Sequence, residues 1–159
     1  SAMRGNVTEL VIHKGMNNRA NAFQCAEAAL RSGEIWLDNL RGEAEKVYTV
    51  ATPPDPALKQ VWATGVLTND PTSQNEAWWN SGVTWSYGIG LALDAASPVV
   101  GCADTPRYFI EHIGTMKSGD NLDTTQKDEI AAYKITAYSA GFDTNAAVIL
   151  QTTYLQHIN

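Results

Sequence analysis

The amino-acid sequence predicts an α+β fold, in which one long N-terminal helix covers a face of an antiparallel sheet. Residues 5–40 contain no proline and carry apolar residues at helical spacing. Residues 107–113, 130–138 and 146–154 are rich in β-branched and aromatic residues and are bounded by turn residues, so we expect three strands. The connection over residues 139–145 suits an antiparallel hairpin between the last two strands.

The expected helix carries two apolar groups. The first group should pack against the sheet and comprises Phe23, Ala26, Leu30 and Leu37. The second group should stay exposed in the isolated domain as a candidate partner contact and comprises Val7, Leu10 and Val11. A helix over residues 5–40 would extend about 50 Å, which is longer than a small domain needs for its own core. We therefore expect its N-terminal part to project or to pack on something else.

Between helix and strands, the segment that begins at Pro53 mixes turn residues with aromatic ones. Its most conspicuous feature is a group of three tryptophans, Trp78, Trp79 and Trp85. Flat aromatic side chains can seal a loop onto the core, contact a partner protein or stack on sugars. The three interpretations stay open at this point, with packing the first expectation.

The composition predicts the number of domains and excludes some classes of function. The chain has 159 residues and a formal net charge of -6, so we expect one domain and no binding of nucleic acid. No apolar run approaches the roughly 20 residues that a membrane crossing needs. The first three residues, 1–3, resemble the remnant of a cleaved expression tag, which leaves a single domain over residues 4–159. We divide this domain into a helix (4–41), a connecting region (42–105) and the sheet (106–159).

Few residues suggest a disulfide, a metal site or a catalytic site. Cys25 and Cys102 lack the paired spacing of a zinc site, so they form a disulfide if the protein is exported or remain two buried thiols. The three histidines also lack metal-ligand spacing. Asp120 and Asp123 could offer oxygen ligands to calcium, but their loop lacks the EF-hand order and is expected to be merely solvated. We expect no cofactor and no enzymatic activity.

Four segments of the chain are similar to motifs of one known family. Residues 18–31, NRANAFQCAEAALR, resemble the AFQAAEAALR helix segment of the PilX family of type IV minor pilins. The other three segments occur in the same order and resemble its PRYVIE, YRITA and VLQSTY strands; they are residues 106–111 (PRYFIE), 133–138 (YKITAY) and 148–154 (VILQTTY). The matches cover about a third of the chain. They depart at Cys25, where the family commonly has alanine.

The resemblance implies a type IV pilin fold, whose N-terminal helix begins as a membrane anchor and continues into a globular head. It also implies an upstream leader and anchor, a location on the periplasmic face of the inner membrane and then in the pilus fibre, and a disulfide between Cys25 and Cys102. The implied partners are other minor pilins, the major pilin and a PilY-type adhesin. Two alternatives are a minor pseudopilin of type II secretion and a carbohydrate-binding domain that uses Trp78, Trp79 and Trp85.

Overall fold

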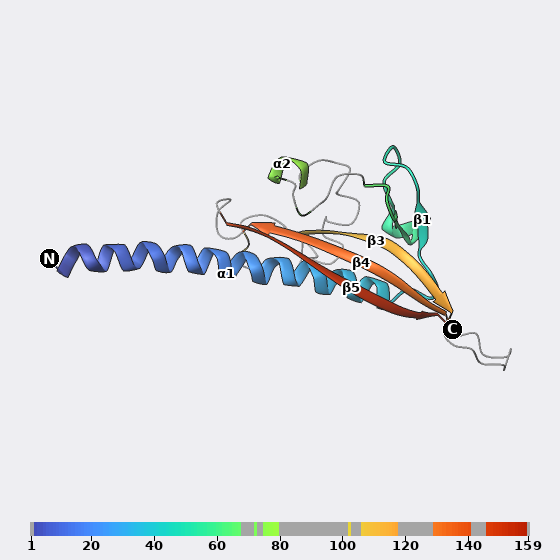
Figure 1. The fold of residues 1–159 in the computed structure, drawn as a ribbon, viewed down its shortest axis with the longest axis horizontal. Coiled ribbons are helices and arrows are strands. Elements are labelled where there is room, and N and C mark those ends of the chain that lie inside the picture. The colour runs from blue at the N-terminus through green and yellow to red at the C-terminus, as the bar shows by residue number, and fades with distance from the viewer. Residues whose placement is uncertain are drawn as a thin grey trace.

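The computed structural model describes residues 2–67, 72, 75–79, 102, 106–117, 129–140 and 146–158, and the side chains of residues 2–16 lie outside this description. Helix α1 covers Ala2–Asp38. The other elements follow in chain order: β1 Glu45–Val47, the 3-10 turn η1 Pro56–Leu58, β2 Gln60–Ala63, α2 Glu76–Trp79, β3 Arg107–Lys117, β4 Glu129–Ala140 and β5 Ala147–Ile158. One long helix and a five-stranded sheet confirm the α+β class (Figure 1).

The sheet is mixed rather than purely antiparallel. Its strand order is β1-β2-β3-β4-β5, in which β1, β2 and β3 run parallel to one another. Strands β3, β4 and β5 form the expected antiparallel part, and β4 and β5 pair along their whole length. The expectation of an antiparallel sheet was wrong for β1 and β2, which lie in the connecting region and are too short to show a strand period in the sequence.

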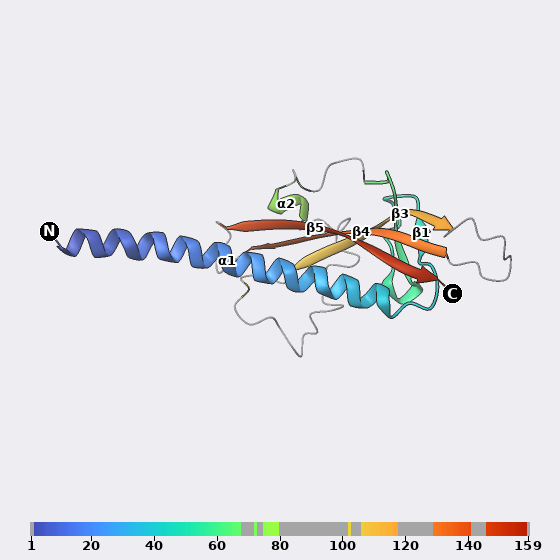
Figure 2. The same cartoon turned by 60° about the horizontal axis from the view of Figure 1, so that its bottom comes forward.

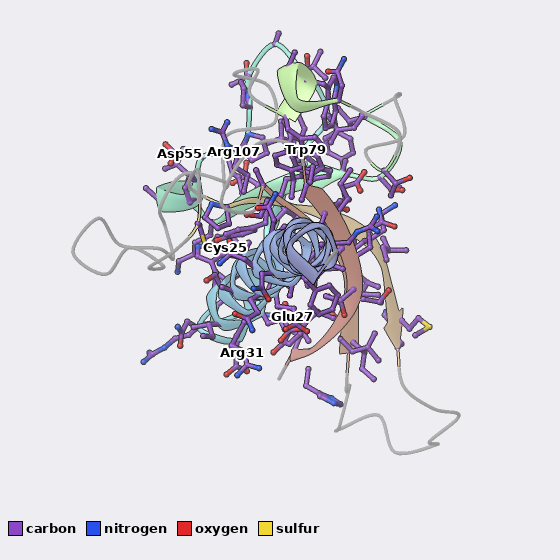
Figure 3. All side chains as sticks on the ribbon, turned by 90° about the vertical axis from the view of Figure 1, so that its left-hand side faces the viewer. Cys25, Glu27, Arg31, Asp55, Trp79 and Arg107 are labelled. Carbon is purple, nitrogen blue, oxygen red and sulfur yellow. A yellow bond between two sulfur atoms is a disulfide. The ribbon has the colours of Figure 1, made fainter. Side chains whose placement is uncertain are left out.

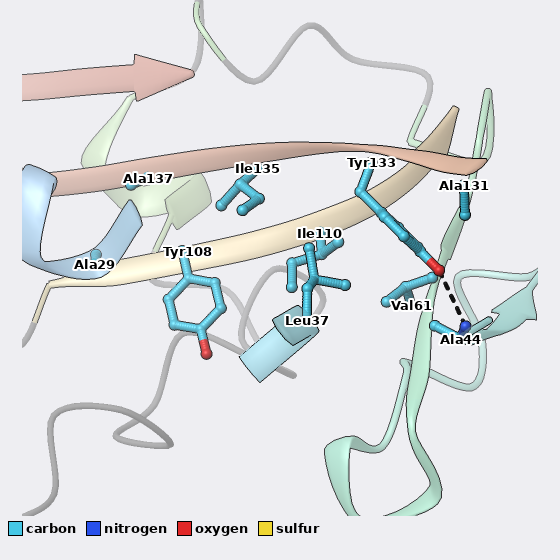
Figure 4. Packing of buried hydrophobic residues seen from close by; sticks show 10 residues of the cluster. All are labelled: Ala29, Leu37, Ala44, Val61, Tyr108, Ile110, Ala131, Tyr133, Ile135 and Ala137. Carbon is cyan, nitrogen blue, oxygen red and sulfur yellow. Dashed lines mark hydrogen bonds between the residues drawn. The ribbon is translucent and has the colours of Figure 1, made fainter. Parts of the chain in front are cut away.

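Helix α1 lies along one face of the sheet and projects beyond it at the N-terminal end (Figures 1 and 2). The projecting part contains Val7, Leu10 and Val11, whose side chains lie outside the description. The C-terminal half of α1 packs on the sheet and closes the larger core cluster, which Figure 4 shows from close by. This cluster includes Leu37 on α1, Tyr108 and Ile110 on β3, and Ile135 on β4.

The face of α1 that meets the sheet consists mostly of small residues. Ala26 and Leu37 are fully buried, and Leu30 packs at the margin of the same cluster. Phe23 is 44% exposed, so its expected place against the sheet was wrong. The neighbouring positions that are buried instead are Ala22, Cys25, Ala26 and Ala29.

Helix α1 and the sheet approach each other closely at Gly33. A Cβ atom added at Gly33 would lie 3.0 Å from Ile135 Cγ2 and 3.2 Å from Tyr108 Cδ2. A side chain at this position would therefore press on Ile135 and Tyr108, which would have to move by a few tenths of an ångström. Phe23 lies on a different side of the helix from the buried positions 22, 26, 29, 33 and 37, so its side chain is on the solvent side.

Candidate assembly surfaces

The disulfide attaches α1 to the segment that precedes β3. Cys25 is bonded to Cys102, and their Cα atoms are 6.1 Å apart across a sequence separation of 77. Cys25 is buried on α1, on a different side of the helix from Glu27 (Figure 3). The pairing that the family resemblance implied is therefore the one in the structure.

A hydrogen-bond network holds the C-terminal end of α1. The last carbonyl groups of a helix lack partners within the helix. Here Gln156 on β5 donates from Nε2 to the carbonyl oxygens of Gly42 at 2.9 Å and of Leu37 at 3.4 Å. The hydroxyl of Tyr133 accepts from the backbone N–H of Ala44 at 3.1 Å (Figure 4) and donates to Gln156 Oε1 at 2.9 Å. Strands β4 and β5 thus determine where the helix ends and how the chain leaves it.

A second polar group lies next to this network. His112 Nε2 is 2.6 Å from Glu43 Oε1, and Thr115 donates its hydroxyl to the same oxygen at 2.7 Å. A bulge between His112 and Gly114 shifts the register at this point of β3. The hydrogen bond from Thr115 lowers the pKa of Glu43, as do His112 and Lys46, while partial burial opposes the change. This group fixes the connection between α1 and β1, and no local sequence pattern indicated it.

The tryptophan group divides between core and surface. Trp79 is fully buried on the sheet face opposite α1, where its ring stacks on Tyr138 with centroids 5.2 Å apart. Arg107 also donates to the carbonyl oxygen of Trp79 at 3.2 Å, which anchors α2 on β3 (Figure 3). The first expectation, packing, is therefore confirmed for Trp79, whose buried side chain leaves no surface for the alternative of a partner contact. Trp78 is half-buried, and Trp85 lies outside the described residues.

The outward side of α1 carries two exposed large apolar side chains. Phe23 is 44% exposed and Ile35 is 55% exposed. Exposed Glu27 and Arg31 lie between them at steps of four residues, so the four side chains share one side of the helix. Large apolar side chains in solvent commonly mark a contact with another protein. The sequence indicated the helix, but it assigned Phe23 to the wrong side and missed Ile35.

Among the described residues, no group of three His, Cys, Asp or Glu side chains could hold a metal ion. Asp120 and Asp123, the unlikely calcium ligands, lie outside the described residues. Within the same described ranges, no helix combines the length and the apolar character that a bilayer crossing requires.

Residues 37–156, which are more than half of the chain, match the family described as "Type IV pilus assembly protein PilX C-term". No curated protein and no solved structure matched in the corresponding comparisons. The family match begins at Leu37, where α1 is held by the sheet, and includes all five strands apart from the end of β5. The chain belongs to the PilX family of type IV pilus assembly proteins.

Proposed function

We propose that this chain is a minor pilin that joins a priming or tip complex of the type IV pilus, together with other minor pilins and a PilY-type adhesin. Membership in the PilX family gives the general role, pilus assembly, and a location in the cell envelope or pilus. The observation that supports the finer proposal is the projection of α1 beyond its own sheet (Figure 1). A helix that extends past its own core needs another surface to cover it.

In this proposal the protein acts by association. The sheet and the disulfide hold one side of α1, so the opposite side remains for neighbouring subunits. Phe23 and Ile35 supply apolar contact area, and Glu27 and Arg31 between them can pair with charges on a neighbour. The complete protein would have a type IV pilin fold, with an upstream anchor in the inner membrane and the head on its periplasmic face.

The type II secretion alternative requires a similar projecting helix, and the family match favours the pilus. The carbohydrate-binding alternative loses support, because buried Trp79 cannot offer a flat face to a sugar. Trp78 is half-buried, and Trp85 lies outside the described residues.

The test uses the full-length protein in cells that make pili. Replacing Phe23 and Ile35 with glutamate should abolish co-purification with the other minor pilins and sharply reduce surface pili. The matched control is Leu58→Glu on η1, a change of the same kind at a side chain that is 61% exposed and far from α1 in the sequence. Normal pili and normal co-purification in the Phe23/Ile35 variant would contradict the proposal.

A further inference from the structure

Strand β5 forms an edge of the sheet that has no second partner strand in the described part of the chain. It runs over 12 residues, Ala147–Ile158, and pairs with β4 in continuous register. The backbone N–H and C=O groups on its other side therefore form a regular row that another extended chain can match.

The composition of β5 lacks the features that usually protect such an edge. Natural edge strands are kept from pairing by short length, charged residues, proline or bulges. Strand β5 contains no proline, no lysine, no arginine and no acidic residue, and its pairing shows no register shift. The opposite edge, β1, is three residues long and contains Glu45 and Lys46. Among the described residues, β1 therefore has these protective features and β5 does not.

A large exposed apolar side chain lies beside the unprotected edge, on the sheet face opposite α1. Leu155 on β5 is 52% exposed and pairs with Ala132 on β4. An added strand would place its side chains next to Leu155 and cover apolar area in addition to forming backbone hydrogen bonds.

We propose that β5 pairs with an extended, uncharged or basic segment of a different pilus subunit, which extends the sheet by one strand. This inference rests on the proposed function. An extended backbone is the partner that matches a row of strand N–H and C=O groups. An acidic segment is disfavoured because the chain carries a net charge of -6 and β5 contributes no Lys or Arg to offset it.

A second copy of this chain is the less suitable partner. Two β5 edges pair most directly in antiparallel fashion about a two-fold axis. Helix α1 runs lengthwise along β5 in both views, so this axis would point the two projecting helices in opposite directions (Figures 1 and 2). Helices that enter one fibre from one membrane need a common direction. The added strand therefore comes from another subunit type.

The experiment is photo-cross-linking of the full-length protein in piliated cells. A benzophenone amino acid replaces Thr153 on the β5 edge, Phe23 on the outward side of α1, or Leu58 on η1 in three separate variants. We expect the Thr153 probe to form an adduct with another pilus subunit, and the cross-linked peptide to be an uncharged or basic strand segment. The Leu58 probe should give no such adduct.

A second change tests whether the Thr153 adduct depends on strand pairing at β5. Leu155→Lys adds the charge that β5 lacks, and we expect about tenfold less adduct at Thr153. Leu58→Lys is the matched control and should leave the yield unchanged, with unfolding temperatures of both variants checked. Three outcomes would overturn this inference without affecting the proposed function. One is an adduct at Phe23 with none at Thr153, and another is a Thr153 adduct with a second copy of the chain. The third is a yield of the Thr153 adduct that Leu155→Lys leaves unchanged. Failure of both the Phe23 and the Thr153 probe would count against the proposed function as well.

Discussion

Removal of the Cys25–Cys102 disulfide would show how much of the folding free energy depends on this bond. The bond closes a loop with a sequence separation of 77 residues. In the chain-entropy treatment, a loop of this size restricts the unfolded chain enough to stabilise the fold by about 4.5 kcal/mol at 25 °C. Single domains are commonly stable by roughly 5–15 kcal/mol, so the predicted loss is a large share of the total.

The assay is urea unfolding of the double variant with Cys25→Ala and Cys102→Ala, followed by circular dichroism. If the free energy of unfolding falls by about 2 kcal/mol for each molar unit of urea, the midpoint should drop by roughly 2 M. Reduced wild-type protein is the control that changes the bond alone, and it should match the double variant within about 1 kcal/mol. Equal stability of the oxidised and reduced wild-type protein would refute the reasoning.

Three further changes test the contacts around α1. Tyr133→Phe removes the hydroxyl that joins Ala44 to Gln156, and the melting temperature should fall by an amount that corresponds to about 1–3 kcal/mol. An unchanged melting temperature would mean that water replaces the hydroxyl. Gly33→Val introduces a branched side chain where a Cβ would already lie 3.0 Å from Ile135, so urea unfolding should show a loss of about 2 kcal/mol or more despite the better helix propensity. A gain in stability would show that the sheet can move away from α1. Glu43 has a lowered pKa in the folded state, so its contribution to stability is present above the ordinary value of 4.5 and is lost as pH falls through the lowered pKa. Melting temperatures of wild-type protein and Glu43→Gln should therefore differ at pH 7 and converge in acid, and a constant difference would contradict this assignment.

Long periodic segments made much of the fold predictable. The expected helix over residues 5–40 and the observed α1, Ala2–Asp38, agree closely because a helical period over many residues is hard to produce by chance. Strand β3 continues four residues past its expected end at Ile113, because the bulge lets pairing with β4 resume at Gly114. Strands β1 and β2 were missed, since segments of three and four residues depend on pairing with a distant strand rather than on their own pattern.

The candidate site was less predictable because it depends on contacts between distant residues. Hydrophobicity alone favoured Phe23 for the sheet side of α1, whereas the buried face follows positions 22, 26, 29, 33 and 37, which are mostly small residues. Gln156 reaches Leu37 across 119 positions of sequence, and no pattern around either residue indicates that contact. The disulfide could be anticipated through the family resemblance, since the two cysteines by themselves were compatible with free thiols.

The disulfide also changes how the chain responds to mechanical tension. A pull on the N-terminal end of α1 reaches the head at Cys25, and the bond passes the force to Cys102 without extending the chain between them. This stretch, a sequence separation of 77 positions, cannot lengthen when the oxidised domain unfolds, and at about 3.4 Å per position it would otherwise contribute roughly 260 Å of contour length. Single-molecule pulling should therefore show an extension shorter by that amount in the oxidised protein. After its sheet has unfolded, an oxidised subunit is therefore shorter under tension than a reduced one, because the chain between Cys25 and Cys102 stays closed.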